Sequence, residues 1–324
     1  MFERRHLQIK LNLNEVRNCV EPYINGSITT ARLISSGLSN TNYHIIASNN
    51  TQYIFRIHHD KKTAIKEYKL NQNLCKLTKK IPLTLHQLDD TIHHHTCSII
   101  EFLPGKLLSD ISFSTNLIPI YKELANFIAD INQYQFNTPG QLDKQLKPKP
   151  FLTQETSHHP YVNFMLDCLN GSNVKNNIPS VLINDIKNFV IRHEHLTTCI
   201  TNISPHLVHG DFKPENILVK SNTNNQLQLS GIIDWEYARS DYIYADIATL
   251  FRNYIPKKND GILTAFANEL SYRDISLVSD WFILTKYIDF INLLAFLDSK
   301  LPRKNLYQSI IATLKNSMTY IENC

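Results

Sequence analysis

The chain has 324 residues, of which 43% are hydrophobic and 19% are charged, so it can bury a sizeable core and is not expected to be disordered. Its 33 Lys and Arg residues nearly balance its 29 Asp and Glu residues, and the net charge of +4 argues against a dedicated nucleic-acid binder. The six cysteines are scattered without a C-x-x-C pair, which favours reduced thiols in a cytoplasmic protein over a zinc site or a disulfide framework. The sequence opens without an apolar signal core. Its most hydrophobic stretch, 281–297, is interrupted by Lys286 and Asp289, so we expect a buried helix there and no membrane partner.

Strand patterns dominate the first hundred residues. Alternation is clearest at 53–57, where apolar side chains face one way and Arg56 faces the other. Asn49-Asn50, just before this segment, is a hairpin signal. The predicted strands are 32–35, 43–47, 53–57 and 98–103, and a helix is expected over 62–77.

Helical periods dominate the remainder of the chain. The predicted helices are 120–131, 182–190, 281–297 and 307–321. The segment 136–160 is rich in Pro, Gln and Lys, and it is expected to be a loop or a mobile insertion. A strand-rich first third followed by a helix-rich remainder predicts two lobes, with a hinge near Glu101 to Gly105.

The most informative run extends from His209 to Val219 and reads HGDFKPENILV. A hairpin signal at Asn224-Asn225 follows it, and a strand beginning at Leu227 then leads to Asp234-Trp235-Glu236. Phosphoryl transfer requires a carboxylate that orients and deprotonates the attacking hydroxyl. It also requires oxygen ligands for Mg²⁺ and a cation on the phosphates that are not transferred.

The spacing of this run suits that chemistry. Asp211 and Asn216 are five residues apart on a tight loop, which places a base and an amide oxygen on either side of one metal ion. Asp234, at the end of a neighbouring strand, supplies an anionic ligand. Mg²⁺ prefers few carboxylates combined with phosphate oxygens and waters, so one Asp and one Asn suffice. The pattern predicts an ATP-dependent phosphotransferase with Asp211 as base and with Mg²⁺ held by Asn216 and Asp234.

The run resembles the catalytic loop H-x-D-x-x-x-x-N of the protein-kinase-like superfamily. Gly210 and the later I-D-W-E are similar to the aminoglycoside phosphotransferase and choline/ethanolamine kinase branch. The extension from Asp234 to Ala238, followed by D-I-A at Asp246, is especially similar to choline, ethanolamine and thiamine kinases. The resemblance implies that Asp246 is a structural acid bracing the catalytic loop.

The resemblance also implies a fold and a division of labour. The fold is an α+β, two-lobed protein-kinase-like fold with an antiparallel-sheet N-lobe and a mainly helical C-lobe. Residues 1–103 would form the nucleotide-binding N-lobe, and residues 104–324 would carry the catalytic loop and the acceptor-binding helices.

In the N-terminal half, the loop from Ser36 to Tyr43 is similar to the nucleotide-covering loop G-[LM]-[ST]-N-x-N-[YF] of choline kinases. Backbone N–H groups of this loop and the small polar side chains of Ser39, Asn40 and Thr41 are expected to contact the phosphates. Arg56 occupies the position of the strand lysine that binds the α- and β-phosphates, and its planar fork can grip phosphate oxygens in two places. Glu67 in the following helix is expected to pair with Arg56 and hold it in place.

Four further positions complete the expected nucleotide and catalytic sites. Glu101 and Leu103 lie in the expected hinge, where backbone groups meet adenine, and Leu218 is a candidate for the floor under the base. Lys213, two residues after the base, stands where Ser/Thr protein kinases have a lysine that approaches the γ-phosphate, so we assign it a catalytic role.

Aromatic residues after the metal motif favour a cationic acceptor, because a quaternary ammonium group is bound by an aromatic cage with a nearby acid. The available aromatic residues are Trp235, Tyr237, Tyr242, Tyr244, Trp281 and Tyr287, and the acids are Glu236, Asp241 and Asp289. We select Glu236, Tyr237 and Trp281 as acceptor contacts and expect a choline-, ethanolamine- or thiamine-like substrate. An aminoglycoside acceptor, which favours several acids in an open cleft, is the alternative.

Two rival functions are less favoured. A protein kinase would have D-F-G where this chain has Asp234-Trp235-Glu236, and no A-P-E follows within the next few dozen residues. A pseudokinase that only binds nucleotide has no need to keep Asp211, Asn216 and Asp234 together. The enzyme is expected to act as a monomer or homodimer.

Two histidine runs, His93-His94-His95 and His58-His59, raise the question of a metal site. Adjacent residues on a strand point to opposite faces and cannot easily share one ion. We therefore expect these histidines at the surface or in loops.

Overall fold

The computed structural model of the chain describes residues 6–35, 39–92, 94–112, 116–151, 158–200, 203–256, 261–299 and 304–324. The chain divides into two compact units, each assembled from segments that are distant in sequence. Unit 1 comprises Met1–Thr115, Leu142–Lys147 and Glu215–Glu236. Unit 2 comprises Asn116–Gln141, Pro148–Pro214 and Tyr237–Cys324. The division of lobes at residue 103 stays a prediction.

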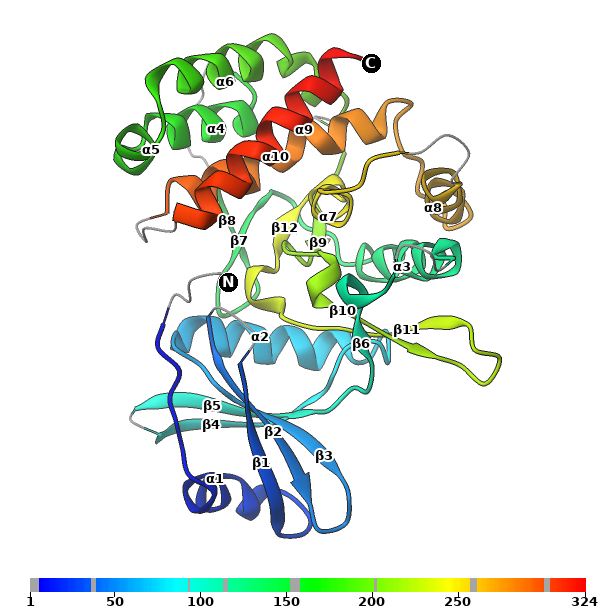
Figure 1. Cartoon of the computed structure of the whole chain (residues 1–324). Coiled ribbons are helices and arrows are strands. Elements are labelled where there is room, and N and C mark those ends of the chain that lie inside the picture. The colour runs from blue at the N-terminus through cyan, green and yellow to red at the C-terminus, as the bar shows by residue number, and fades with distance from the viewer. Residues whose placement is uncertain are drawn as a thin grey trace. The chain divides into compact units, whose positions relative to one another are not determined.

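A five-stranded antiparallel sheet forms the centre of unit 1, in the order β1-β2-β3-β5-β4 (Figure 1). The strands are β1 (Ile28–Ile34), β2 (Thr41–Ala47), β3 (Gln52–Ile57), β4 (Thr84–Ile92) and β5 (His95–Glu101). Asn50 adopts a φ of 63° in the connection between β2 and β3, where the Asn49-Asn50 turn was expected. The predicted antiparallel sheet in the first third of the chain is confirmed.

Two helices pack against this sheet. Helix α1 (Leu13–Val20) adds two buried valines to the apolar core formed by one face of the strands. Helix α2 (Lys61–Leu74) lies on the other face, where its Glu67 pairs with Arg56 of β3. The alternation along β3 thus separates an apolar face from a polar one.

A hairpin from the second half of the chain also belongs to unit 1. Strand β10 (Ile217–Ser221) pairs with β11 (Leu227–Ile232) and with the short strand β6 (Lys106–Leu107). The last N–H of β11 donates to the carbonyl of Lys80 at 2.7 Å, and the Lys80 ammonium donates to another β11 carbonyl. These bonds fix the strand that leads to Asp234 to the loop before β4.

Unit 2 is mainly helical, and helices α4, α7 and α10 pack around α9. Its helices are α3 (Ile118–Ile131), α4 (Pro160–Asn170), α5 (Ser172–Asn177), α6 (Ser180–Arg192), α7 (Tyr244–Leu250), α8 (Ile262–Ser271), α9 (Trp281–Leu297) and α10 (Lys304–Glu322). All four helices predicted after residue 104 are confirmed, and α9 has the expected bounds. Within the described ranges, no helix combines the length and apolar character that crossing a membrane requires.

A small sheet with the order β8-β7-β12-β9 accompanies these helices. Its strands are β7 (Gly140–Leu142), β8 (Pro148–Pro150), β9 (His206–Val208) and β12 (Arg239–Asp241). The expectation of a loop over 136–160 is therefore wrong for β7 and β8, since strands of three residues are too short to show an alternation. Residues 152–157 of that segment lie outside the described residues.

Short 3-10 helices lie between the longer elements. They are η1 (Glu21–Tyr23), η2 (Leu108–Asp110), η3 (Glu194–Ile200), η4 (Pro214–Asn216) and η5 (Trp235–Tyr237).

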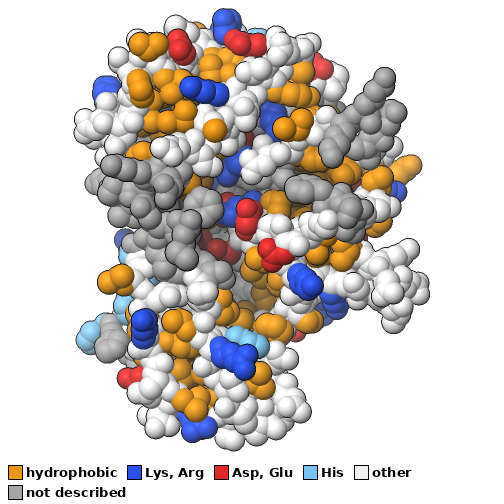
Figure 2. All heavy atoms as spheres, viewed as in Figure 1, with side chains coloured by type: hydrophobic (Ala, Val, Ile, Leu, Met, Phe, Trp, Pro, Cys, Tyr) orange, Lys and Arg blue, Asp and Glu red, His pale blue; other side chains and the backbone are white. Residues whose placement is uncertain are grey.

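Figure 2 shows described basic and acidic side chains intermingled on the face in view, with apolar side chains between them. This distribution agrees with the small net charge of +4.

Candidate active site

The catalytic loop of unit 2 begins directly after β9. The backbone N–H groups of His209 and Gly210 each donate to the Asp246 carboxylate at 2.8 Å. His209 is fully buried, and its Nδ1 lies 3.2 Å from the backbone nitrogen of Asp211. Burial raises the pKa of Asp246, while the two N–H groups oppose that shift. The predicted role of Asp246 as the acid that braces this loop is confirmed.

Gly210 is required by the shape of this loop. Its φ of 79° lies in the left-handed region, which side chains disfavour. A Cβ atom at this position would lie 2.3 Å from the carbonyl oxygen of Tyr237. The turn therefore accepts only glycine, and it delivers Asp211 at a fixed point of the loop.

Asp211 and Lys213 form an ion pair within this loop. The Lys213 ammonium lies 2.8 Å from the Asp211 carboxylate. The Asp211 side chain is 9% exposed and that of Lys213 is 31% exposed, so the carboxylate is sheltered but the ammonium reaches solvent. The two predicted catalytic residues are thus brought together.

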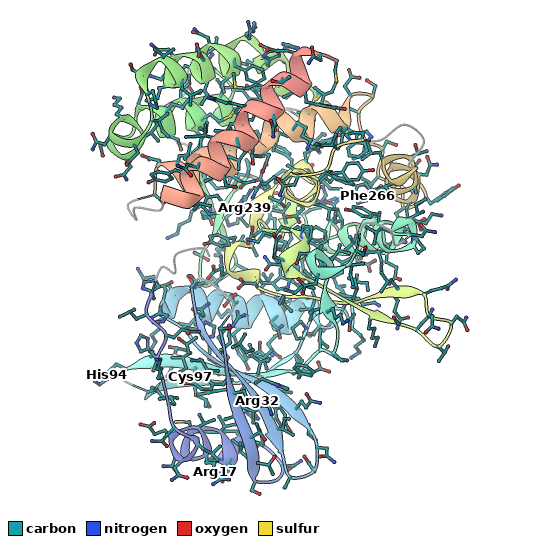
Figure 3. All side chains as sticks on the ribbon, viewed as in Figure 1. Arg17, Arg32, His94, Cys97, Arg239 and Phe266 are labelled. Carbon is teal, nitrogen blue, oxygen red and sulfur yellow. The ribbon has the colours of Figure 1, made fainter. Side chains whose placement is uncertain are left out.

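A buried polar network supports the same loop from β12. Arg239 (Figure 3) donates to the Gly210 carbonyl at 3.4 Å and to the Asp241 carboxylate at 2.7 Å. Asp241 also accepts a hydrogen bond from the Tyr161 hydroxyl. Sequence reasoning missed this network, because Tyr161 lies 80 positions from Asp241 and the two meet only in the folded unit.

Unit 1 holds the cluster expected to bind phosphate, and we name it the Arg56 cluster: Asn42, Arg56, Glu67 and Asp234. One Arg56 nitrogen, Nη1, lies 3.5 Å from Glu67 and 3.6 Å from Asp234, and Nε donates to the Asn42 amide oxygen at 3.0 Å. Burial raises the pKa of Glu67 to about 7, against the opposing effect of Arg56. The pairing of Arg56 with Glu67 is confirmed, whereas contact of Arg56 with nucleotide stays a prediction.

Asn216 and Asp234 lie at the same end of the β10–β11 hairpin. The backbone N–H of Ile233 donates to the Asn216 carbonyl at 3.0 Å, so Asp234 follows directly after a residue bonded to Asn216. Asp234 has a φ of 70°, and its side chain is 34% exposed. One amide and one exposed carboxylate fit Mg²⁺, whose remaining ligands are usually phosphate oxygens and waters.

The nucleotide-covering loop is described from Ser39 onward, and Ser36, Gly37 and Leu38 lie outside the described residues. The side chain of Asn40 accepts the backbone N–H of His59 at 3.3 Å. Thr41 is fully buried, and its hydroxyl accepts the N–H of Ile9 at 3.1 Å. The Thr41 hydroxyl thus ties the N-terminal segment to β2, and contact of Ser39, Asn40 and Thr41 with phosphate stays a prediction.

The expected adenine contacts lie together in unit 1. Leu103 is half-buried against Gly231 of β11, and Leu218 is half-buried and pairs with Leu107. The Glu101 carboxylate accepts a hydrogen bond from the backbone N–H of Leu83 at 3.2 Å. Adenine binding by these residues stays a prediction.

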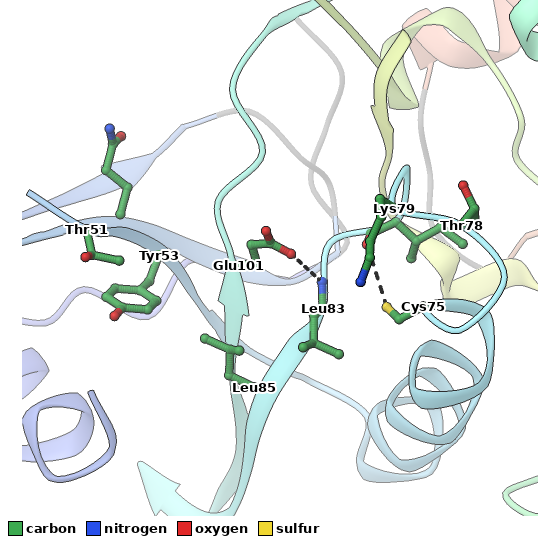
Figure 4. Close-up of a pocket in the computed structure, with 10 residues that line it drawn as sticks. Thr51, Tyr53, Cys75, Thr78, Lys79, Leu83, Leu85 and Glu101 are labelled. Atoms are coloured by element: carbon green, nitrogen blue, oxygen red, sulfur yellow. Dashed lines mark hydrogen bonds between the residues drawn. The ribbon is translucent and has the colours of Figure 1, made fainter. Parts of the chain in front are cut away.

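A pocket of about 390 Å³ lies elsewhere in unit 1 (Figure 4). It is lined by the start of β3, the end of α2, the start of β4 and Glu101. Its lining includes no member of the Arg56 cluster, so it is not the expected phosphate site.

The residues proposed for a cationic acceptor are mostly internal. Trp235, Tyr244 and Tyr287 are buried. Trp281 is half-buried, and its ring packs 6.0 Å from that of Phe266 (Figure 3) in an apolar cluster. Glu236 and Tyr237 are half-buried, and the Glu236 backbone oxygen accepts a hydrogen bond from the Lys66 ammonium at 2.7 Å.

Two of the three acids proposed for the cage are already paired. Asp241 binds Arg239, and Asp289 binds Arg252 at 2.7 Å. Of the proposed acids, Asp241 and Asp289 are therefore committed to arginines, and the cage would depend on Glu236. Acceptor contacts by Glu236, Tyr237 and Trp281 stay predictions.

His58 lies in the connection directly after β3, as the expectation of surface or loop positions allows, but it is buried there and only 3% exposed. His94 is exposed at the tip of the β4–β5 hairpin (Figure 3), and His93 lies outside the described residues. In the described part of the chain, no group of three or more His, Cys, Asp or Glu residues could hold a metal ion. The spacing of Arg56 and His58 by two residues was a signal that both share one face of β3.

Comparison with known proteins gives a family and a fold. A profile described as "Phosphotransferase enzyme family" matches residues 30–276. The GDP complex of aminoglycoside 2'-phosphotransferase-IIIa is similar, with a TM-score of 0.68 and 15% identity over 96% of this chain and 99% of that chain. A thermostable mutant of aminoglycoside phosphotransferase APH(4)-Ia, in ternary complex with ADP and hygromycin B, gives a TM-score of 0.64 and 14% identity over 95% and 97% of the two chains. No curated protein sequence matches the chain.

An antiparallel sheet with a helical partner unit, an H-G-D loop and an I-D-W-E segment together define a phosphotransferase with a protein-kinase-like fold. The family profile covers well over half of the sequence, so the chain belongs to the phosphotransferase enzyme family. It is a small-molecule phosphotransferase, that is, a small-molecule kinase. The predicted fold class and enzyme class are confirmed.

Proposed function

We propose that this enzyme transfers the γ-phosphate of ATP to a hydroxyl group of a small acceptor of the aminoglycoside class. The observation that carries the proposal is the catalytic loop, in which Asp246 holds two consecutive N–H groups directly before the sheltered carboxylate of Asp211. The acceptor class is supported by the solved structures of similar fold, two of which are aminoglycoside phosphotransferases. The internal pairing of Asp241 and Asp289 also makes a quaternary-ammonium cage less favourable.

In the proposed reaction, Asp211 accepts the proton of the acceptor hydroxyl. The hydroxyl oxygen forms a bond to the γ-phosphorus while the bond from that phosphorus to the β,γ-bridging oxygen breaks, and ADP leaves. Lys213 exchanges its contact with Asp211 for one with the transferred phosphate. Arg56, held by Glu67, binds the phosphates that stay on ADP.

Asn216 and Asp234 would hold Mg²⁺. The ion, when bound, neutralises charge on the phosphate oxygens. The side chain of Asp234 is partly exposed and Asn216 follows the catalytic loop directly, so both can serve the same ion.

A choline-, ethanolamine- or thiamine-like acceptor is the second candidate. It is favoured by the similarity of Asp234 to Ala238, with the following D-I-A, to kinases of those substrates. The half-buried Tyr237 and Tyr242 keep some aromatic surface accessible for such an acceptor.

The test measures release of the nucleoside diphosphate, ADP from ATP or GDP from GTP, with Mg²⁺ and in the presence of single acceptors: kanamycin, hygromycin B, choline, ethanolamine and thiamine. An aminoglycoside should stimulate ADP release, and Asp211→Asn should lower turnover by about 10²- to 10⁴-fold because the general base is lost. Asp185→Asn, an exposed substitution on α6, is the matched control and should act like the unaltered enzyme. Stimulation by choline or thiamine alone would show that the acceptor is of the second class and not an aminoglycoside. Full turnover by Asp211→Asn would show that Asp211 is not the catalytic base.

A further inference from the structure

His58 faces the carboxylate that holds Arg56. It follows β3 directly, and its backbone N–H donates to the Thr96 carbonyl at 2.9 Å, so the strand geometry continues and places His58 on the same face as Arg56. Its Nδ1 lies 3.5 Å from the Glu67 Oε2, whereas the other Glu67 oxygen faces Arg56. Its Nε2 lies 2.8 Å from the Ser98 hydroxyl.

The two facing atoms have no other hydrogen bond. Among the residues that the structure describes, the Nδ1 of His58 and the Oε2 of Glu67 are both buried and without a hydrogen-bond partner. Buried polar groups in native proteins almost always find one. A Ser98 hydroxyl that donates to Nε2 sets the tautomer with its proton on Nδ1, and that proton points toward Glu67. A shift of a few tenths of an ångström completes a hydrogen bond of about 3 Å.

We propose that His58 is a positioning residue for ATP binding, whose Nδ1–H holds one oxygen of Glu67 so that the other stays on Arg56. This inference rests on the proposed role of Arg56 at the phosphates. Arg56 also has Asp234 at 3.6 Å. Once Asp234 serves the metal ion, Glu67 is the acid left to orient Arg56, and a Glu67 held at both oxygens orients it better.

The electrostatics of the pair agree with this role. Burial lowers the pKa of His58 to about 3, so His58 is a neutral donor at physiological pH. Burial raises the pKa of Glu67 to about 7, and a hydrogen bond to the carboxylate form opposes that shift. The charged or titratable groups that face the pair are Arg56, His59, Asp60, Lys66, His95, Asp234 and Glu236. Losing the His58 donor should therefore raise the pKa of Glu67 further and weaken its grip on Arg56 at neutral pH.

Two amide substitutions separate positioning from simple packing. In His58→Asn the side-chain nitrogen takes the place of Nδ1, whereas in His58→Gln it reaches only the place of Nε2. We would titrate each variant with Mg²⁺-AMP-PNP by calorimetry between pH 5.5 and 8.5. His58→Gln should weaken binding about tenfold at pH 7, the size of one lost hydrogen bond to a charged group. In the same variant, the pH below which nucleotide binding is lost should rise by about one unit (the acid limb of the binding profile). His58→Asn should bind within about threefold of the unaltered protein.

Cys97→Ala is the control for stability, because Cys97 is buried in the apolar core of the same sheet (Figure 3), whereas Glu67 pairs with Arg56 on the polar face. Equal affinities and equal acid limbs for His58→Asn and His58→Gln would overturn the positioning role, as would a Cys97→Ala variant that weakens binding equally. Arg56→Gln separates the two proposals. If it binds nucleotide normally, the proposed role of Arg56 fails, and if it loses binding while His58→Gln does not, only the inference about His58 fails.

Discussion

At the scale of single residues, the catalytic loop depends on one glycine. Gly210 and Gly261 share a positive φ, of 79° and 68°, and both belong to unit 2. Their surroundings differ, because a Cβ at Gly210 would lie 2.3 Å from a backbone oxygen. Among the described residues, a Cβ at Gly261 would meet only the end of Ile118 at 3.5 Å. The comparison separates the cost of the backbone conformation from the cost of the collision.

Gly210→Ala should therefore disable the enzyme, while Gly261→Ala should not. The left-handed conformation costs an alanine about 1–2 kcal/mol at either site. At Gly210 the collision also moves the loop, and a misplaced base should lower turnover by about 10²-fold or more. Steady-state ADP release and urea unfolding check both variants. Similar turnover for Gly210→Ala and Gly261→Ala would contradict the claim that the Tyr237 carbonyl leaves no room for a Cβ atom at position 210.

Glu67 makes a second prediction at this scale, about pH. Its pKa is raised by burial from 4.5 to about 7, so between these values the folded protein binds more protons than the unfolded chain. The free energy of unfolding contributed by Glu67 therefore falls as pH rises through this window. Glu67→Gln cannot titrate, so its stability relative to the unaltered protein should rise from pH 4.5 to 7 by on the order of 2–3 kcal/mol.

Urea unfolding at pH 5 and at pH 7.5, read as the difference between Glu67→Gln and the unaltered protein, measures this effect. Groups elsewhere in the chain cancel in the difference. A difference that stays constant with pH, or that moves in the opposite direction, would show that the Glu67 pKa is not raised. The same variant should bind Mg²⁺-ADP more weakly, because an uncharged amide no longer orients Arg56 by an ion pair.

At the scale of elements, α9 carries charges into the middle of unit 2. Lys286 is 7% exposed and donates to the carbonyls of Phe251, Arg252 and Tyr254 at 2.7, 2.8 and 2.9 Å. These carbonyls belong to the turn that directly follows α7, and the Phe251 carbonyl also accepts the backbone N–H of Tyr254 at 3.0 Å. Lys286 therefore fastens the end of α7 to α9, and α7 carries Asp246.

Lys286→Met should destabilise unit 2 by about 2–3 kcal/mol at pH 7, since the three carbonyls lose a charged donor. Burial lowers the pKa of Lys286 to about 8, so between pH 8 and its ordinary value of 10.5 the unfolded chain binds more protons. The stability of the unaltered protein relative to Lys286→Met should thus rise across that range. Lys122→Met, at an exposed pair with Glu269, is the control and should change stability by less than about 1 kcal/mol. Equal losses for the two variants would exclude the capping role.

Elements with a long periodic pattern could be predicted from the sequence. The apolar run of α9 spans 17 residues, and α3 follows a clear 3-and-4 spacing, so both were recognised. β7, β8 and β12 have three residues each and form only because distant segments pair with them. The sequence of residues 136–160 alone therefore does not predict β7 and β8.

The residues of the candidate site also fall into two groups: those that a local sequence pattern predicts and those that only the folded chain brings together. Roles for Asp211, Asn216 and Asp234 could be proposed from the sequence, because their spacing is local and the chemistry of phosphoryl transfer restricts the residue types. The support of the loop by Tyr161 and Asp241 could not, since these residues are 80 positions apart and meet only in the folded unit. The burial of Thr41 and the hydrogen bond of its hydroxyl to the N–H of Ile9 could not be known from residue type either, and its contact with phosphate stays a prediction.

At the scale of the whole molecule, the residues assigned to nucleotide and metal are concentrated in unit 1. The Arg56 cluster, Asn216, Leu218 and the hinge all belong to it, whereas Asp211 belongs to unit 2. The chain passes from unit 2 to unit 1 between Pro214 and Glu215, within the motif itself. Nucleotide binding should therefore act first on the stability of unit 1.

Hydrogen exchange with Mg²⁺-ADP tests this distribution. At 100 times the dissociation constant, a ligand that binds only the folded state stabilises it by about 2.7 kcal/mol, which slows exchange through global opening by about 100-fold. The slowing should appear in β3, in α2 and in the β10–β11 hairpin, and it should shrink when EDTA removes the metal. Asp234→Asn should bind ADP but lose the part of the slowing that depends on Mg²⁺. Slowing confined to α9 and α10 of unit 2, or an Asp234→Asn variant that responds to Mg²⁺ fully, would move the nucleotide and the metal ion to other residues.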